Sequence, residues 1–293
     1  MSGPLQLLKD FQPAKEFFVG VDSDGCVFDT MEIKHKECFT PMFIRYFRLQ
    51  AVSKYARECW EFVNLYSKTR GVNRFPALVR AVKLLGDRPQ VKSRNVKLPD
   101  LSALENWIAR ETKLSTATLD AEVNAGKTGL APIKVWSDAV NQAIADIVQG
   151  VPPFPLAREC LQKLSARADA LCISQTPGAA LRREWAEQGL APLVRIIAGQ
   201  EMGNKAEHLQ FAAAGKYAPE KTLMIGDGPG DLAAARQNQA LFFPIVPGQE
   251  GTSWRRLHDE GLDRFFALRF AGDYEAALLK KFDASLPEKP AWQ

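Results

Sequence analysis

The chain has 293 residues, of which 46% are hydrophobic and 25% charged, and it is long enough for one large domain or two smaller ones. Its net charge of +4, from 38 basic and 34 acidic side chains, is too small to indicate a nucleic-acid-binding protein. No apolar run approaches the roughly 18 residues that a membrane span requires.

The cysteine content favours a reducing compartment. There are five cysteines, an odd number, and no Cys-x-x-Cys pair. The N-terminal residues 1–15 lack an apolar core followed by a cleavage site. We therefore expect a cytoplasmic monomer or homodimer that binds neither nucleic acid nor membrane.

The first predicted element is a buried strand at 16–21, which ends at Asp22-Ser23-Asp24-Gly25. The region 31–150 that follows shows helical periodicity, at 34–49, 55–66, 102–110 and 137–148, and no strand pattern. Its polar, proline-containing stretch 86–101 predicts a loop. The region ends at Gly150-Val151-Pro152-Pro153, which is typical of a domain boundary.

Strands and helices alternate from there onward. Apolar segments predict strands at 168–173, 194–198, 222–225 and 241–246, and helical spacing predicts helices at 157–166, 179–188, 204–214 and 231–239. We expect an α/β fold, with a Rossmann-like, doubly wound parallel sheet. The predicted core comprises 1–30 and 151–293, and a helical cap domain at 31–150 is inserted into it.

Polar residues follow the predicted strands at the points where the strands end. Asp22 and Asp24 follow the first, Ser174 the second, and Asp227 and Asp231 the fourth. Ligands of open α/β sheets bind beyond the carboxyl ends of the strands, so these side chains should converge there. Clustered carboxylates repel each other unless a cation lies among them, and such hard oxygen ligands suit Mg²⁺. A carboxylate can also attack phosphorus and form an aspartyl-phosphate.

Four motifs resemble those of the haloacid dehalogenase superfamily, in members with an α-helical cap such as phosphoglycolate phosphatases and β-phosphoglucomutase-like proteins. They are the segment from Asp22 to Thr30, Ser174 after a strand, Lys205 opening a helix, and Gly226-Asp227-Gly228-Pro229-Gly230-Asp231. The first and fourth motifs, when they occur together, are specific for this superfamily. Ser174 and Lys205 are weak motifs alone and support the resemblance only through their placement. Cys26 departs from the family, which often has threonine there.

The resemblance implies a role for each motif residue. Asp22 attacks phosphorus, and Asp24 acts as general acid and then general base. Mg²⁺ is bound by Asp22, by Asp227 and by the backbone carbonyl of Asp24, with Asp231 supporting the metal or its ligands. Ser174 and Lys205 contact the phosphoryl group, and Gly25 and Gln175 adjoin it as candidate substrate-binding residues. Dehalogenating relatives lack an acid at the position of Asp24, so its presence favours phosphate esters.

The predicted cap contains a basic loop at 68–75 around Gly71. It is similar to the cap loop of the β-phosphoglucomutase-like group, which implies that Arg74, or else Arg70, contacts an anionic group of the substrate. Arginine suits bidentate recognition of carboxylate or phosphate.

These observations together predict a Mg²⁺-dependent phosphatase acting on a small phosphorylated metabolite. Two alternatives remain open. A phosphosugar mutase of the same superfamily would use the same Asp22 and Asp24. A catalytically silent binding protein could keep the fold, although the retention of Asp22, Asp24, Lys205 and Asp227 argues against it.

Overall fold

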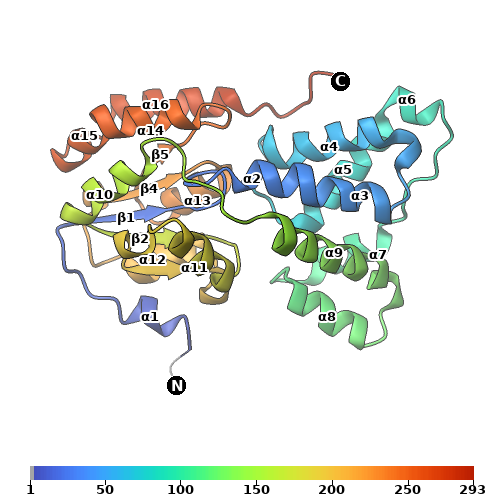
Figure 1. Cartoon of the computed structure of the whole chain (residues 1–293), viewed down its shortest axis with the longest axis horizontal. Helices are drawn as coiled ribbons and strands as arrows, with labels where there is room; N and C mark the ends of the chain where they lie inside the picture. Colours follow the sequence, from blue (N-terminus) through green and yellow to red (C-terminus); the bar gives the residue numbers. More distant parts are fainter. Residues whose placement is uncertain (1–2) are drawn as a thin grey trace. The chain divides into compact units, whose positions relative to one another are not determined.

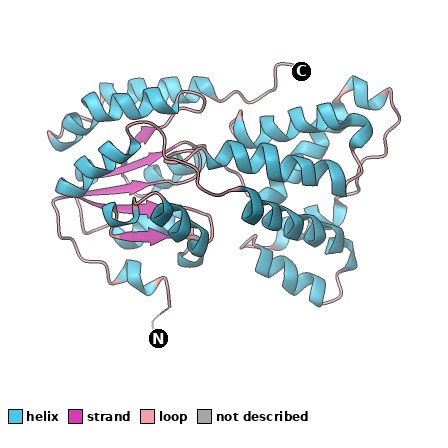
Figure 2. Ribbon diagram, in the orientation of Figure 1, coloured by secondary structure: helices cyan, strands magenta, loops and turns pink. Residues whose placement is uncertain are grey.

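A sheet of five parallel strands organises the core of the protein (Figures 1 and 2). The computed structural model describes residues 3–293. The strand order is β3-β2-β1-β4-β5, with β1 at Phe17–Val21, β2 at Ala168–Ile173, β3 at Ile196–Ala198, β4 at Thr222–Gly226 and β5 at Leu241–Pro244. The predicted fold class is confirmed, and every predicted strand is present to within two residues at each end.

Side chains of each strand alternate between the two faces of the sheet, as the period of a strand requires. Phe17, Val19 and Val21 of β1 pack into one hydrophobic cluster, and Phe18 packs into a second. Gly20 also faces the second cluster, where a β-carbon would lie 2.6 Å from Ile173 Cδ1. Both faces are therefore covered, which explains why the strands are apolar throughout rather than alternating.

The connecting helices divide between these two faces (Figure 2). Residues of α10 (Ala157–Arg167), α11 (Gly178–Glu187) and α14 (Glu250–Arg256) belong to the first cluster. Residues of α12 (Lys205–Ala212) and α13 (Pro229–Gln237) belong to the second, together with α1 (Gln6–Lys9). The sheet is thus doubly wound, and in sheets of this kind ligands bind beyond the carboxyl ends of the strands.

The chain divides into two compact units, which we call the core unit and the helical unit. The core unit contains the sheet, within residues up to Met31 and Gly150–Pro287. The helical unit contains Glu32–Gln149 and Glu288–Gln293. The last six residues were expected in the core. They belong to the helical unit because Trp292 packs edge-on against Phe62 and the Arg88 guanidinium lies 4.2 Å from its ring centroid.

The helical unit contains no strand among its described residues. Its helices are α3 (Thr40–Tyr46), α4 (Ser53–Leu65), α5 (Arg74–Asp87), α6 (Pro89–Lys92), α7 (Ser102–Arg110), α8 (Thr116–Asn124) and α9 (Ala131–Ile147). The expectation of a loop throughout 86–101 is wrong at 86–87, which end α5, and at α6, a single turn that starts at Pro89. The helix α2 (Thr30–Ile33) lies at the boundary of the units and continues as a π-helix, η1 (Lys34–Phe39).

Three helices at the end of the core unit have no counterpart in the predicted elements. They are α14, α15 (Leu262–Phe266) and α16 (Asp273–Ser285), with a second π-helix, η7 (Leu257–Gly261), between the first two. Within residues 3–293, no helix combines the length and apolar character needed to cross a bilayer. All five cysteines are buried and carry free thiols.

Candidate active site

Asp22 lies directly beyond β1, at the carboxyl edge of the sheet. Its backbone N–H donates to the carbonyl of Ile225 on β4, which extends the ladder between the two strands by one residue. The carboxylate accepts from the backbone N–H of Ser23 at 2.8 Å, and the residue is only 4% exposed. Trp185 donates to the Ser23 hydroxyl and so anchors the turn on α11. Asp22 is therefore buried and held by its own turn.

Asp227 and Asp231 come from the loop and helix that follow β4. The carboxylate of Asp231 accepts from the backbone N–H groups of Asp227 and Gly228, so it caps the N-terminus of α13. Gly226 makes this possible, since a β-carbon there would lie 2.5 Å from Asp231 Cβ and Cγ. Asp231 thus fixes the loop that presents Asp227.

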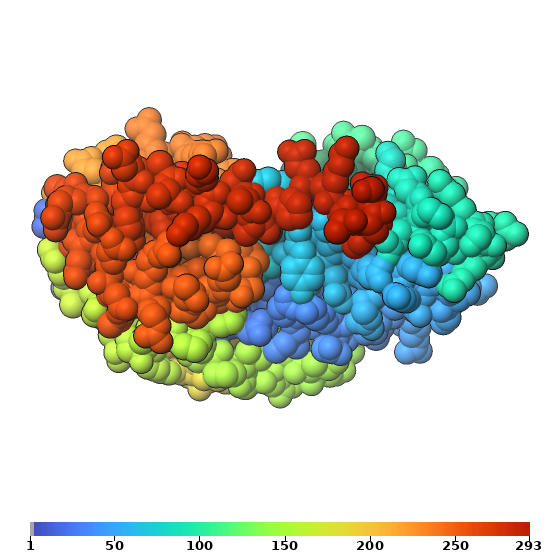
Figure 3. Space-filling model, turned by 90° about the horizontal axis from the view of Figure 1, so that it is seen from above, coloured from blue at the N-terminus to red at the C-terminus, as the bar shows by residue number. Residues whose placement is uncertain are grey.

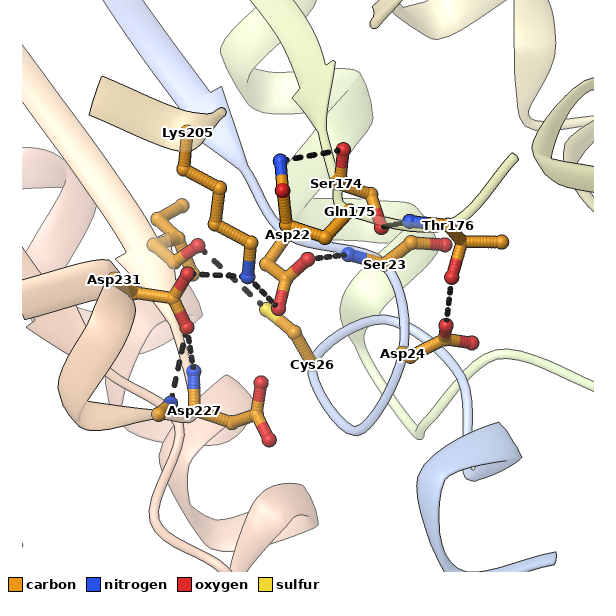
Figure 4. A network of polar contacts seen from close by, with 12 residues as sticks. Asp22, Ser23, Asp24, Cys26, Ser174, Gln175, Thr176, Lys205, Asp227 and Asp231 are labelled. Carbon is orange, nitrogen blue, oxygen red and sulfur yellow. Dashed lines mark hydrogen bonds and ion pairs between the residues drawn. The ribbon is translucent and has the colours of Figure 1, made fainter. Parts of the chain in front are cut away.

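Lys205, the first residue of α12, lies between these acids (Figure 4). Its Nζ is 2.7 Å from Asp22 Oδ2 and 2.5 Å from Asp231 Oδ1. Burial alone would lower its pKa, but the carboxylates of Asp22, Asp231 and Asp227 outweigh burial and raise it. Lys205 is therefore a permanent cation at this site.

The carboxylates of Asp22, Asp227 and Asp231 form a group that can hold a metal ion. Each offers a ligand oxygen, all of these atoms lie within 4.8 Å of one another, and all three residues are buried. Burial raises the pKa of Asp22 well above its ordinary value; Lys205 counteracts this, and Asp231 and Asp227 raise it further. Lys205 forms ion pairs with two of these acids, Asp22 and Asp231. The donor set and its charge fit one hard divalent cation.

Asp24 occupies a separate position on the same turn. Its carboxylate accepts from the hydroxyl of Thr30 on one oxygen, and from the hydroxyl of Thr176 at 2.6 Å on the other. It is not one of the three clustered carboxylates. Sequence reasoning gave neither threonine a role, although Thr30 closes the first motif and Thr176 lies two residues after Ser174. The carboxylate of Asp24 therefore has its own hydrogen-bond partners and lies outside the group of carboxylates that could hold a metal ion.

Ser174 lies beyond β2, on the side of Asp22 away from Asp227 (Figure 4). It is 2% exposed, and its hydroxyl accepts from the backbone N–H of Thr176. The side chain of Gln175 donates to the carbonyl of Gly203, which ties this turn to the loop before α12. The turn therefore brings Ser174, Gln175 and Thr176 to the same edge as the acids.

The remaining residues of the first motif shape the turn itself. Gly25 has a φ of +76°, a left-handed conformation that favours glycine, and its N–H donates to the carbonyl of Phe28. Cys26 is fully buried, with Trp254 donating to its carbonyl. Burial raises the pKa of the Cys26 thiol, and the nearby Asp22 carboxylate raises it further. Cys26 is therefore a packed thiol rather than a nucleophile.

Arg70 and Arg74 belong to the helical unit, where their contacts differ. Arg70 is 3% exposed and donates to the carbonyl of Leu65. Arg74 begins α5, donates to Ser137 and Asn141, and lies 5.1 Å from the Phe39 ring centroid. Burial lowers its pKa to about 10, with partial compensation by Asp138. Arg74 is a half-buried cation with neutral hydrogen-bond partners; that it reaches a substrate stays a prediction.

Comparisons with known proteins give structural neighbours only. No protein-family model and no curated protein matches the chain. Similar solved structures include a predicted phosphoglycolate phosphatase from Haemophilus somnus, 12% identical, covering 79% of this chain and 86% of that one, with a TM-score of 0.48. Another is a candidate haloacid dehalogenase-like hydrolase from Bacteroides fragilis, at 15% identity, 82% and 93% coverage, and a TM-score of 0.49.

A third neighbour is a candidate hydrolase of the same superfamily from Bacillus subtilis, solved with bound magnesium. It is 14% identical, covers 78% of this chain and 86% of that one, and has a TM-score of 0.43. Similarity at this level concerns the type of fold, so an activity has to be argued from the site itself.

Proposed function

We propose that the chain is a Mg²⁺-dependent phosphatase of the haloacid dehalogenase type, which hydrolyses a small phosphorylated metabolite through an aspartyl-phosphate on Asp22. One observation carries the proposal. Buried carboxylates from the ends of β1 and β4 meet around Lys205, while Asp24 is held apart from them by two hydroxyl groups. Phosphoryl transfer needs this combination of a nucleophile, an acid and concentrated positive charge.

Asp22 and Asp227 would hold Mg²⁺ with the backbone carbonyl of Asp24, and Asp231 would fix the loop that carries Asp227. When bound, the cation would neutralise phosphoryl oxygens and keep the Asp22 carboxylate ionised. Lys205 supplies a second positive charge beside Asp22 Oδ2. The hydroxyl of Ser174 would donate to a phosphoryl oxygen from the other side of Asp22.

The reaction then follows in two displacements. An oxygen of Asp22 attacks phosphorus, the bond from phosphorus to the ester oxygen breaks, and Asp24 gives its proton to that leaving oxygen. In the second step a water molecule attacks the same phosphorus atom, and Asp24 takes its proton. The bond between phosphorus and Asp22 breaks, which releases inorganic phosphate and restores both carboxyl groups.

The choice of substrate would depend on the helical unit. Arg74 is a half-buried cation whose hydrogen-bond partners are neutral, so an anionic ligand group is its natural complement. We propose that the substrate is a small metabolite with an anionic group beyond the phosphate. Arg70 is the second candidate for this contact.

The experiment is a screen of phosphorylated metabolites with Mg²⁺, with released phosphate as the readout. We expect turnover by the wild type, none by Asp22→Asn, and unchanged turnover by the surface control Asp10→Asn. Circular dichroism and the Tm should show that Asp22→Asn remains folded. Turnover by folded Asp22→Asn at a rate close to wild type would refute the nucleophile.

Metal dependence is tested with the same substrates. Chelation by EDTA should stop phosphate release, and added Mg²⁺ should restore it. Conversion of a phosphosugar to its isomer, without free phosphate, would instead identify a mutase. Full activity in EDTA would exclude the proposed metal site.

A further inference from the structure

A pocket lies in the core unit, away from the clustered carboxylates. It has a volume of about 420 Å³ and lies between the end of β5, helix α14 and helix α16. Pockets for small ligands are typically of this size or larger. None of the residues assigned to the active site lines it. Figure 3 shows this region from above, where the red surface that includes α16 adjoins the orange surface of the preceding residues.

The lining of this pocket is apolar on one part and cationic on another. Its apolar residues are Phe243, Pro244, Val246, Leu278 and Ala284. Its charged residues are Arg256, at the end of α14, and Lys281, on α16; no carboxylate lines the pocket. The two cations reach it from different helices, whereas their exposed sequence neighbours Arg255 and Lys280 do not line it.

The two cations lack acidic partners. Within residues 3–293, neither Arg256 nor Lys281 forms an ion pair, although the chain pairs many other surface cations, such as Arg264 with Glu260 and Lys221 with Glu16. Arg256 is half-buried and Lys281 is exposed at the rim. Two unpaired cations beside an apolar wall favour a ligand that carries a negative charge on an apolar body.

We propose that this pocket binds a small organic anion, with its carboxylate or phosphate group at Arg256 and Lys281 and its apolar part against Val246 and Leu278. Thr252 also lines the pocket, and its hydroxyl group can donate to the same anionic group. The site is independent of the proposed phosphatase chemistry, because it shares no residue with it.

The test uses 8-anilinonaphthalene-1-sulfonate, a fluorescent anion with an apolar body, as the probe on the full chain. We expect saturable binding to the wild type and to the control variant Arg255→Ala/Lys280→Ala. The variant Arg256→Ala/Lys281→Ala should bind the probe at least about tenfold more weakly, the equivalent of 1.4 kcal/mol from two contacts. Ala284→Trp, which fills the pocket from an exposed position, should abolish binding at an unchanged Tm.

Competing ligands identify the chemistry. Hexanoate and hexylphosphonate should displace the probe, and the better competitor distinguishes a carboxylate from a phosphate site; hexanol, which lacks the charge, should displace it poorly. Equal probe affinity in the wild type and Arg256→Ala/Lys281→Ala would overturn the proposal. So would undiminished binding to folded Ala284→Trp, or displacement by hexanol as effective as by the two anions.

Discussion

Lys205 Nζ lies 2.7 Å from Asp22 Oδ2, so the proposed nucleophile is paired with a buried ammonium group. This pairing has two effects. It helps to keep the Asp22 carboxylate ionised against burial and against the neighbouring acids. It also places a positive charge where negative charge would be carried by a transferred phosphoryl group.

Replacing Lys205 with alanine should lower kcat by roughly 100-fold or more, as removal of a single charge-stabilising group does in other active sites. The ion pair of Lys221 with Glu16 offers a control, because these residues precede β4 and β1 at the amino ends of the strands, whereas the site lies beyond their carboxyl ends. We expect Lys221→Ala to keep wild-type kcat. The measurement is steady-state kinetics on the best substrate of the screen. Similar kcat values in Lys205→Ala and Lys221→Ala would contradict the role of Lys205.

Gly226→Ala should disable the site by moving Asp231. The added β-carbon would lie 2.5 Å from Asp231 Cβ, and overpacking of this kind costs about 1–3 kcal/mol. Gly230→Ala, four residues further on, meets nothing within 4 Å and is the matched control. The Tm of thermal unfolding and kcat should both fall in Gly226→Ala, and both should stay near the wild-type values in Gly230→Ala. Normal activity in Gly226→Ala would show that Asp231 can move without loss.

Thr176→Val should impair the proton transfer assigned to Asp24, because it removes one of the two hydroxyl groups that hold this carboxylate. The loss should be larger for an alkyl phosphate, whose leaving oxygen needs a proton, than for p-nitrophenyl phosphate, whose leaving group does not. Thr176→Ser keeps the hydroxyl and should restore the ratio of kcat/KM values. An equal loss on both substrates would mean that Thr176 acts on something other than acid catalysis.

His208 should make the protein less stable as the pH falls from about 6.5 to 4. Burial lowers its pKa to about 4, with Lys205 adding to the effect, whereas the unfolded chain binds a proton near pH 6.5. Between these values only the unfolded state is protonated, so stability rises with pH, by up to about 3 kcal/mol. Denaturant titrations at several pH values should show a smaller slope for His208→Gln than for His258→Gln. An unchanged slope in His208→Gln would contradict this assignment.

Arg74→Ala should raise KM for an acidic metabolite more than for p-nitrophenyl phosphate, which has no second anionic group. The expected difference is about tenfold or more, since a charge-assisted hydrogen bond contributes about 1.5–3 kcal/mol. Arg45, also in the helical unit, provides the control variant Arg45→Ala. Equal changes of KM on both substrates would refute the assignment of Arg74 to substrate binding.

Much of the core was predictable from sequence because its signals are local. Each strand is an apolar run that ends at a polar turn, so the position of Asp22 at the edge of the sheet followed from the pattern alone. Its meeting with Asp227 followed from the rule that ligands bind beyond the carboxyl ends of parallel strands. The conformation of Gly25 and the fixed position of Asp24 depend on partners such as Phe28 and Thr176, which periodicity does not indicate.

Other features could not be predicted, for physical reasons. The helix α8 has little amphipathic character, and its start depends on a capping box at Ser115 and Thr118 rather than on an apolar stripe. The short helix α6 is a single turn and depends on its surroundings. Association of the final residues with the helical unit depends on Trp292 and Phe62, which lie far apart in the sequence.

The contacts of Trp292 mean that the polypeptide passes between its two units three times: after Met31, after Gln149 and after Pro287. In the whole chain Phe62 and Arg88 are each only 5% exposed. A gene fragment encoding 32–149 alone would lack Trp292, and so would uncover the ring of Phe62 and the guanidinium of Arg88. A chimaera that exchanges residues 32–149 between proteins would therefore need to include residues 288–293 as well.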